Sequence, residues 1–163
     1  MKHTFVLYAL VVAGCLLLST AVGTAQDYAA LKGVEKVKVA FDVRTGVPQT
    51  AARQLKLIHD THKQLIALKK SPVSAVVFIG PAVKLISTNR EGFKPEELPL
   101  LDEIAQTVSA IANDGIPLEV CLFAAKVFNV DPATVLPEIT RVENGYVSLI
   151  GYETQGYSLI PVY

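Results

Sequence analysis

The sequence predicts an α/β domain in which a mainly parallel sheet is flanked by helices. Runs with strand periodicity alternate along the chain with longer segments of helical periodicity. The 163 residues fit one domain, and no linker or internal repeat divides them. Alternation of this kind implies right-handed βαβ units, whose strands run parallel.

The first half of the domain contains two predicted strands and one long helix. Residues 37–43 are β-branched with a period of two, which predicts a strand. Residues 50–70 place apolar side chains along one helical face. Residues 74–79 form a continuous apolar run, as expected of a central parallel strand covered on both faces. Gly80-Pro81 ends this strand, and residues 82–97 fit one helical turn followed by a polar loop.

The second half continues the alternation. Its predicted elements are a helix at 101–112, a strand at 118–123, a short helix beginning near 131, a strand at 140–143, a helix at 146–155 and a last strand at 157–163. The first of these helices has a clear apolar stripe and stops at Asn113-Asp114-Gly115, a good C-terminal signal. Pro132 suits the first position of the short helix.

Residues 1–25 are typical of a secretory signal peptide. Lys2 precedes an apolar run of 14 residues at 5–18, whereas a membrane-spanning helix needs ~20. Gly23 and Ala25 supply the small residues expected before a cleavage site, which predicts a mature domain of 26–163. We therefore expect a periplasmic or secreted protein with no stable membrane insertion after the signal is removed.

A second interpretation of the N-terminus involves Cys15. Val-Ala-Gly-Cys at residues 12–15 resembles the bacterial lipobox, which would make Cys15 a lipidated N-terminus. Three leucines follow Cys15 directly, where a lipoprotein usually becomes polar, so we prefer the soluble, exported form. An uncleaved anchor is a weaker third alternative.

The charge balance excludes several classes of partner. Fifteen basic and fifteen acidic residues give a net charge of zero, and removal of residues 1–25 leaves −1. Nucleic-acid binding and polybasic attachment to a membrane surface both require an excess of positive charge. Removal of the signal also leaves Cys121 as the single thiol, which excludes an intramolecular disulfide.

Common catalytic motifs are absent from the sequence. No Gly-x-Gly and no Gly-x-Ser-x-Gly occurs, so dinucleotide loops, Walker loops and the hydrolase elbow are excluded. His59 and His62 share a helix face, but Asp60 lies on a different face and a third metal ligand is lacking. We expect His62 to pack between helix and sheet and His59 to be solvated, and we expect no metal or organic cofactor.

Cys121 is the candidate catalytic residue because of its place in the predicted sheet. Open parallel sheets carry their sites at the carboxyl ends of strands, where Cys121 lies. Amides of a following helix, with Lys126 nearby, would lower the pKa of the thiol, whereas Glu119 on the same strand face opposes this. A buried structural cysteine explains the same pattern, and position alone leaves both readings open.

Three motifs are similar to those of one family. Gly-Ile-Pro-Leu-Glu-Val-Cys-Leu-Phe-Ala-Ala at 115–125 resembles the cysteine segment of the DsrE/DsrF-like family of sulfur-relay proteins. Residues 76–83 resemble its strand and Gly-Pro loop, and Asn144-Gly145 with Gln-Gly-Tyr at 155–157 resembles its closing pattern. The resemblance covers about residues 35–163. One departure is Ile79, where many relatives carry His.

This resemblance implies a flavodoxin-like, DsrEFH-like three-layer sandwich assembled as a homotrimer or homohexamer. It also implies that Cys121 forms a persulfide, with protein sulfur donors and acceptors as partners. The expected supporting residues are Ala124, Lys126, Glu119, Gly80, Pro81 and Val83. The alternative is a non-catalytic oligomeric module that binds a small ligand in the same pocket and uses Cys121 structurally.

Overall fold

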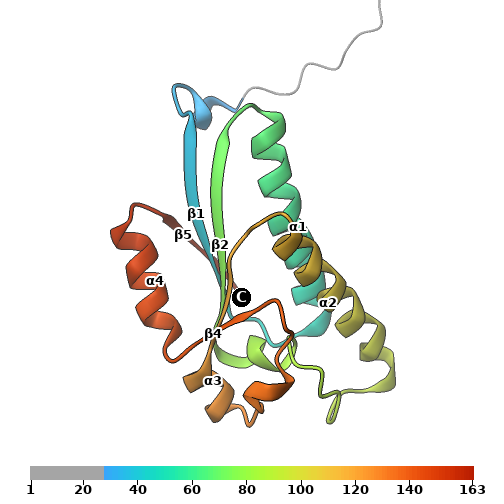
Figure 1. The fold of residues 1–163 in the computed structure, drawn as a ribbon. Helices are drawn as coiled ribbons and strands as arrows, with labels where there is room; N and C mark the ends of the chain where they lie inside the picture. Colours follow the sequence, from blue (N-terminus) through green and yellow to red (C-terminus); the bar gives the residue numbers. More distant parts are fainter. Residues whose placement is uncertain (1–27) are drawn as a thin grey trace, which may run out of the picture. The chain divides into compact units, whose positions relative to one another are not determined.

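The computed structural model describes residues 28–163 and divides the chain into two units, residues 1–33 and 34–163 (Figure 1). Within the first unit, the described part is a single 3₁₀ turn, η1 (Ala29–Leu31). The predicted signal peptide and Cys15 lie outside the described residues. Between residues 28 and 163, no helix is both long and apolar enough to cross a membrane.

The second unit is built on a five-stranded sheet in which every pairing is parallel, in the order β4-β3-β2-β1-β5. The strands are β1 (Lys36–Val43), β2 (Ser71–Phe78), β3 (Leu118–Cys121), β4 (Thr140–Val142) and β5 (Ser158–Val162). The predicted α/β class is confirmed, with the parallel sheet that βαβ units require.

Helices cover both faces of this sheet. The long helices are α1 (Pro48–Ala67), α2 (Leu98–Asn113) and α4 (Gly145–Thr154); the short ones are α3 (Leu122–Val127), η2 (Gly80–Lys84), η3 (Pro95–Glu97) and η4 (Pro132–Thr134). Figure 1 shows α1 and α2 on one side of the sheet and α4 on the other, with α3 beyond the carboxyl ends of the strands. These three layers form the expected sandwich.

Most predicted boundaries differ from the observed ones by one to three residues, and three of the differences have a clear structural cause. α1 ends at Ala67 rather than at 70, because Lys69 takes a left-handed conformation with φ 57° and turns the chain into β2. β2 begins at Ser71 rather than at 74, since its first residues pair with β1 although their sequence carries no strand periodicity. β3 stops at Cys121 rather than at 123 because Cys121 caps α3.

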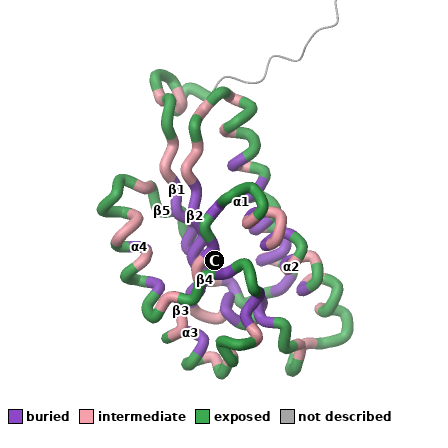
Figure 2. The backbone as a smooth tube through the Cα atoms, in the orientation of Figure 1, coloured by how far each residue is buried: buried purple, intermediate pink, exposed green. Residues whose placement is uncertain are grey.

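The main hydrophobic core lies between the sheet and the α1–α2 layer (Figure 2). Ser74 contacts α1 through His62, whereas Glu119 contacts α4 through Tyr152, which identifies the two faces of the sheet. Alternation along the strands therefore places Val76 and Phe78, both buried, on the α1–α2 face. Buried side chains of the two helices pack there, among them Leu55, Ile58, Leu101, Ile104, Val108 and Ile111.

The two helical histidines are structural. His62 is buried, and its Nδ1 lies 2.9 Å from the Ser74 hydroxyl, as predicted for the helix–sheet interface. The prediction for His59 is wrong: it is buried rather than solvated, because Asp114 at the end of α2 places a carboxylate oxygen 2.7 Å from its Nε2. Among the residues that the structure describes, no group of three or more His, Cys, Asp or Glu side chains could hold a metal ion.

Burial of His62 predicts a pH-dependent stability. Desolvation lowers the pKa of His62 below its ordinary 6.5, so only the unfolded chain takes up this proton as the pH falls below that value. The unfolded state then binds more protons, and the free energy of unfolding falls until the folded-state pKa is passed. We expect a lower urea midpoint at about pH 5.5 than at about pH 7.5. His62→Gln should reduce this difference, and an unchanged difference would contradict the assignment.

Candidate functional site

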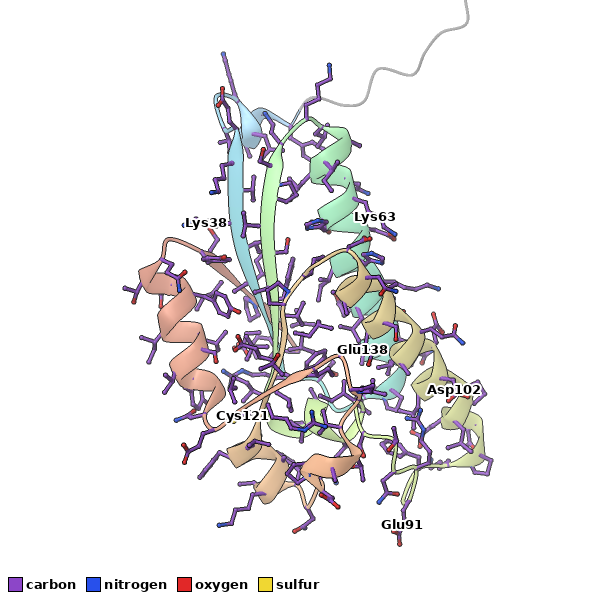
Figure 3. The ribbon with its side chains drawn as sticks, viewed as in Figure 1. Lys38, Lys63, Glu91, Asp102, Cys121 and Glu138 are labelled. Carbon is purple, nitrogen blue, oxygen red and sulfur yellow. The ribbon has the colours of Figure 1, made fainter. Side chains whose placement is uncertain are left out.

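Cys121 stands where β3 becomes α3, and Figure 3 labels it at this junction. It is the N-cap residue of α3, and its Sγ accepts a hydrogen bond from the Ala124 N–H at 3.4 Å. The residue is free of any disulfide and only 2% exposed. The sequence therefore predicted both the strand-end position and the amide contact, while the burial also fits the structural alternative.

The start of α4 covers Cys121. A Cβ added to Gly145 would lie 3.0 Å from the Cβ of Cys121 and 2.9 Å from Cδ1 of Ile79. Only glycine lets the helix approach the thiol this closely. Ile79, which stands where many relatives of the family resembled carry His, lies against the same residue, Gly145, as Cys121 does.

The Asn144-Gly145 motif has a separate role for each residue. Asn144 is the N-cap of α4, and its side-chain oxygen accepts from the Tyr146 N–H at 3.0 Å. Gly145 supplies the close approach. Glu143, the residue before Asn144, links α3 to the start of α4, because its carbonyl accepts a hydrogen bond from the Phe123 N–H at 3.1 Å.

A cavity of about 700 Å³ opens between α3 and α4 beside Cys121. Its lining comes from α3, the end of β4 and the first turn of α4: Leu122, Phe123, Lys126, Val142, Glu143, Asn144, Val147 and Ser148. Cys121 itself is not among these residues. The thiol therefore lies next to the cavity, behind its wall.

The other predicted site residues fall into two groups. Lys126 lines the cavity, but it stands in the last turn of α3, whereas Cys121 caps the first. Gly80, Pro81 and Val83 belong to η2 at the same edge of the sheet, and η2 packs against α3 and β3. Val83 is fully buried, and none of the three lines the cavity. These three residues therefore support the segment that carries Cys121 and do not line the cavity.

Glu119 lies beneath α4, two residues before Cys121. Its Oε1 accepts from the Tyr152 hydroxyl at 2.8 Å, and its buried Oε2 has no hydrogen-bond partner within the described part of the chain. Burial and the bond to Glu119 raise the pKa of Tyr152 well above its usual range. Glu119 therefore binds α4 through its hydrogen bond with Tyr152.

The polar contacts of Arg44 with Asp42 and Tyr146 were not predicted from the sequence. Its guanidinium binds Asp42 Oδ2 at 2.8 Å and donates to the Tyr146 hydroxyl at 3.0 Å, with the Tyr146 ring 5.1 Å away. The bond to Tyr146 and the Asp42 carboxylate raise the pKa of Arg44. Arg44 and Tyr146 are 102 positions apart, so only the fold brings them together.

The sheet order and the three layers define a parallel α/β sandwich that solved structures share. Protein MTH1491 of Methanobacterium thermoautotrophicum, of unknown function, matches with TM-score 0.55 and 19% identity, over 78% of this chain and 98% of its own. The ychN protein of E. coli matches with TM-score 0.57 and 11% identity, over 77% and 98%. BT1422 of Bacteroides thetaiotaomicron, also of unknown function, matches with TM-score 0.56 and 15% identity, over 83% and 100%.

The family follows from the sequence model. The model of the DsrE/DsrF-like family matches residues 38–162, so the chain belongs to this family, which is generally related to sulfur relay. A search of curated proteins finds no match. The resemblance stated from the motifs is confirmed by this match, and the solved structures confirm the fold.

Proposed function

We propose that this protein is a persulfide-forming sulfur carrier that acts through Cys121. The observation that carries the proposal is the place of this thiol: it ends the inner strand β3, and its Sγ accepts a hydrogen bond from the Ala124 N–H at 3.4 Å. Membership of the DsrE/DsrF-like family supports it. The thiolate is the nucleophilic form of cysteine, and the Ala124 N–H is a hydrogen-bond donor directed at this sulfur.

The proposed reaction is an exchange at sulfur. The Cys121 thiolate attacks the sulfane sulfur of a donor such as thiosulfate, a new S–S bond forms, and the bond from the sulfane sulfur to the leaving group breaks with its electron pair. Sulfite leaves when thiosulfate is the donor. An acceptor thiolate then attacks the outer sulfur of the persulfide and restores the Cys121 thiolate.

The cavity beside Cys121 provides room for a donor. Lys126 places a cation in a wall that also contains the apolar side chains of Phe123 and Val147. This exposed cation can attract an anionic sulfur compound, although the lining also contains the Glu143 carboxylate. The proposed exchange requires no metal or organic cofactor.

The proposal is tested by peptide mass spectrometry. The full chain is incubated with thiosulfate or inorganic polysulfide, digested without reductant, and the Cys121 peptide is weighed separately from the Cys15 peptide. We expect the mass of at least one sulfur atom on the Cys121 peptide, removed by dithiothreitol. A thiol that iodoacetamide alkylates in native buffer but that gains no sulfur would contradict the proposal.

We also propose that the carrier is an exported homotrimer or homohexamer. Export is inferred from the residues 1–25 pattern described above. Self-association is supported by two exposed apolar side chains of α3, Phe123 and Val127. Apolar side chains that are exposed together often mark a protein–protein interface. Sedimentation should give the trimer or hexamer mass, and Val127→Asp should shift it toward the monomer; a monomeric wild type would contradict this.

One observation favours a second candidate function, a binding module that does not use the thiol. Cys121 is 2% exposed and does not line the cavity, whose walls are largely apolar. Such a protein would retain its small ligand in Cys121→Ser with unchanged affinity. A loss of retention in that variant would exclude this alternative.

A further inference from the structure

Cys121 is buried, and this burial has a consequence for access. Sulfur exchange requires a reagent to reach Sγ, but the first turn of α4 covers the residue. We infer that α4 is a lid, which lifts from the sheet to expose Cys121 and is held closed by polar contacts at both of its ends. The inference depends on the proposed function only for the role of the motion, which is to let a sulfur donor reach Cys121. The motion itself is tested separately.

The apolar attachment of α4 to the sheet is small. Of its ten residues only Gly145 and Leu149 are buried, whereas Val147 and Ile150 are more than 60% exposed. By comparison, α1 buries seven of its twenty residues, including the large apolar side chains of Leu55 and Ile58. Packing against this sheet face therefore contributes little to holding α4 in place.

Polar contacts hold the two ends of α4 instead. At its N-terminal end, the Tyr146 hydroxyl accepts from Arg44 at 3.0 Å. At its C-terminal end, the Tyr152 hydroxyl donates to Glu119 at 2.8 Å, and the Lys38 ammonium donates to the Gln155 carbonyl at 2.7 Å. A cation at the last carbonyls also favours the helix dipole. These contacts connect α4 to β1 and β3.

The closed position leaves two carboxylates incompletely satisfied. Asp42 of β1 and Glu119 of β3 both pair with Val77 of β2, one from each side. Both carboxylates lie on the face of the sheet that α4 covers. Asp42 Oδ1 and Glu119 Oε2 are the buried side-chain oxygens that lack a partner within the described residues. Each carboxylate therefore has one oxygen able to accept a further hydrogen bond on the face that α4 covers.

The ends of α4 supply the points of rotation. Asn144 stands in extended backbone before the helix, and Gly156, with φ 85°, follows the C-cap residue Gln155. A left-handed glycine tolerates further change in its backbone angles at little cost. The helix can thus move as a unit, with its bending confined to residues 143–144 and 155–156.

The lid is tested by the rate at which iodoacetamide alkylates Cys121 in the full native chain, followed on the Cys121 peptide so that Cys15 does not contribute. Tyr152→Phe removes only the hydroxyl that binds Glu119. We expect alkylation roughly tenfold faster, the order given by loss of one hydrogen bond to a charged group. Tyr163→Phe, at an exposed terminal residue, is the matched control and should behave like wild type.

A core variant separates local opening from global unfolding. Ile104→Val weakens the core under α2, on the opposite side of the sheet, and leaves every α4 contact intact. Faster alkylation in Tyr152→Phe than in Ile104→Val, at equal urea midpoints, would support the lid. Equal acceleration in both, or none in Tyr152→Phe, would overturn it. The proposed sulfur carrier fails differently, through a thiol that is alkylated but gains no sulfur.

Discussion

Cys121→Ser is expected to gain no sulfur from thiosulfate or polysulfide, while the wild-type chain gains it at this position. The hydroxyl of serine does not ionise near neutral pH and forms no persulfide, so the effect should be complete rather than partial. The measurement is the mass of the peptide that contains residue 121. No added sulfur on the wild-type Cys121 peptide, or added sulfur on the corresponding variant peptide, would contradict the assignment.

The fold should survive this replacement, which makes the loss interpretable. A serine Oγ can accept the Ala124 N–H as Sγ does, and serine is a favoured N-cap residue. Cys121→Ala removes that acceptor and should reduce the free energy of unfolding by about 0.5–2 kcal/mol. Comparison of the two by urea unfolding distinguishes the capping role of Cys121 from its chemistry. Equal stability of the Ser and Ala variants would show that the cap contributes nothing.

Gly145→Val is expected to give the largest loss of stability among single changes at the site. Its Cβ would lie 2.9 Å from two carbons of Ile79 and 3.0 Å from the Cβ of Cys121, so α4 must shift away from the sheet. Overpacking of this kind typically reduces the free energy of unfolding by about 1–3 kcal/mol. Urea unfolding measures the loss, and Cys121 alkylation should become faster in the same variant.

The same helix offers a matched control for this substitution. A Cβ on Gly151 meets no atom within 4 Å. In a helix interior, alanine is more favourable than glycine by about 1 kcal/mol. Gly151→Ala should therefore be neutral or stabilising.

In the double variant Gly145→Ala with Ile79→Val, the shortened side chain at 79 should recover part of the stability that Gly145→Ala loses. A Gly145→Val chain as stable as wild type would contradict the close approach of α4.

Local sequence patterns were sufficient for the sheet and most helices. The β-branched run of β1 and the apolar run of β2 each bury against helices in the structure, so periodicity and burial agree. The start of β2 was missed because Ser71 and Pro72 show no alternation; pairing with β1 alone makes them a strand. His59 was misplaced since its partner Asp114 is 55 positions away.

The candidate site was predictable in part for the same reason. Cys121 and Ala124 are three positions apart, so a strand followed by a helix places them together. Arg44, Tyr146 and Tyr152 come from distant segments whose contact depends on the crossing of α4 over the sheet. The role of Gly145 is also invisible in sequence, because it depends on which atoms lie opposite its missing side chain.

The most direct test of the sulfur carrier is the release of its sulfur to cyanide. After treatment with thiosulfate and removal of excess donor, the full chain is mixed with cyanide, which takes the outer sulfur of a persulfide as thiocyanate and leaves the thiolate. Both proteins carry Cys15→Ser, so that Cys121 is the single thiol, and we expect close to one thiocyanate per chain when Cys121 is present and none from Cys121→Ser. No thiocyanate from a chain whose Cys121 is alkylated in native buffer, or equal amounts from both proteins, would contradict the proposal that Cys121 carries sulfur.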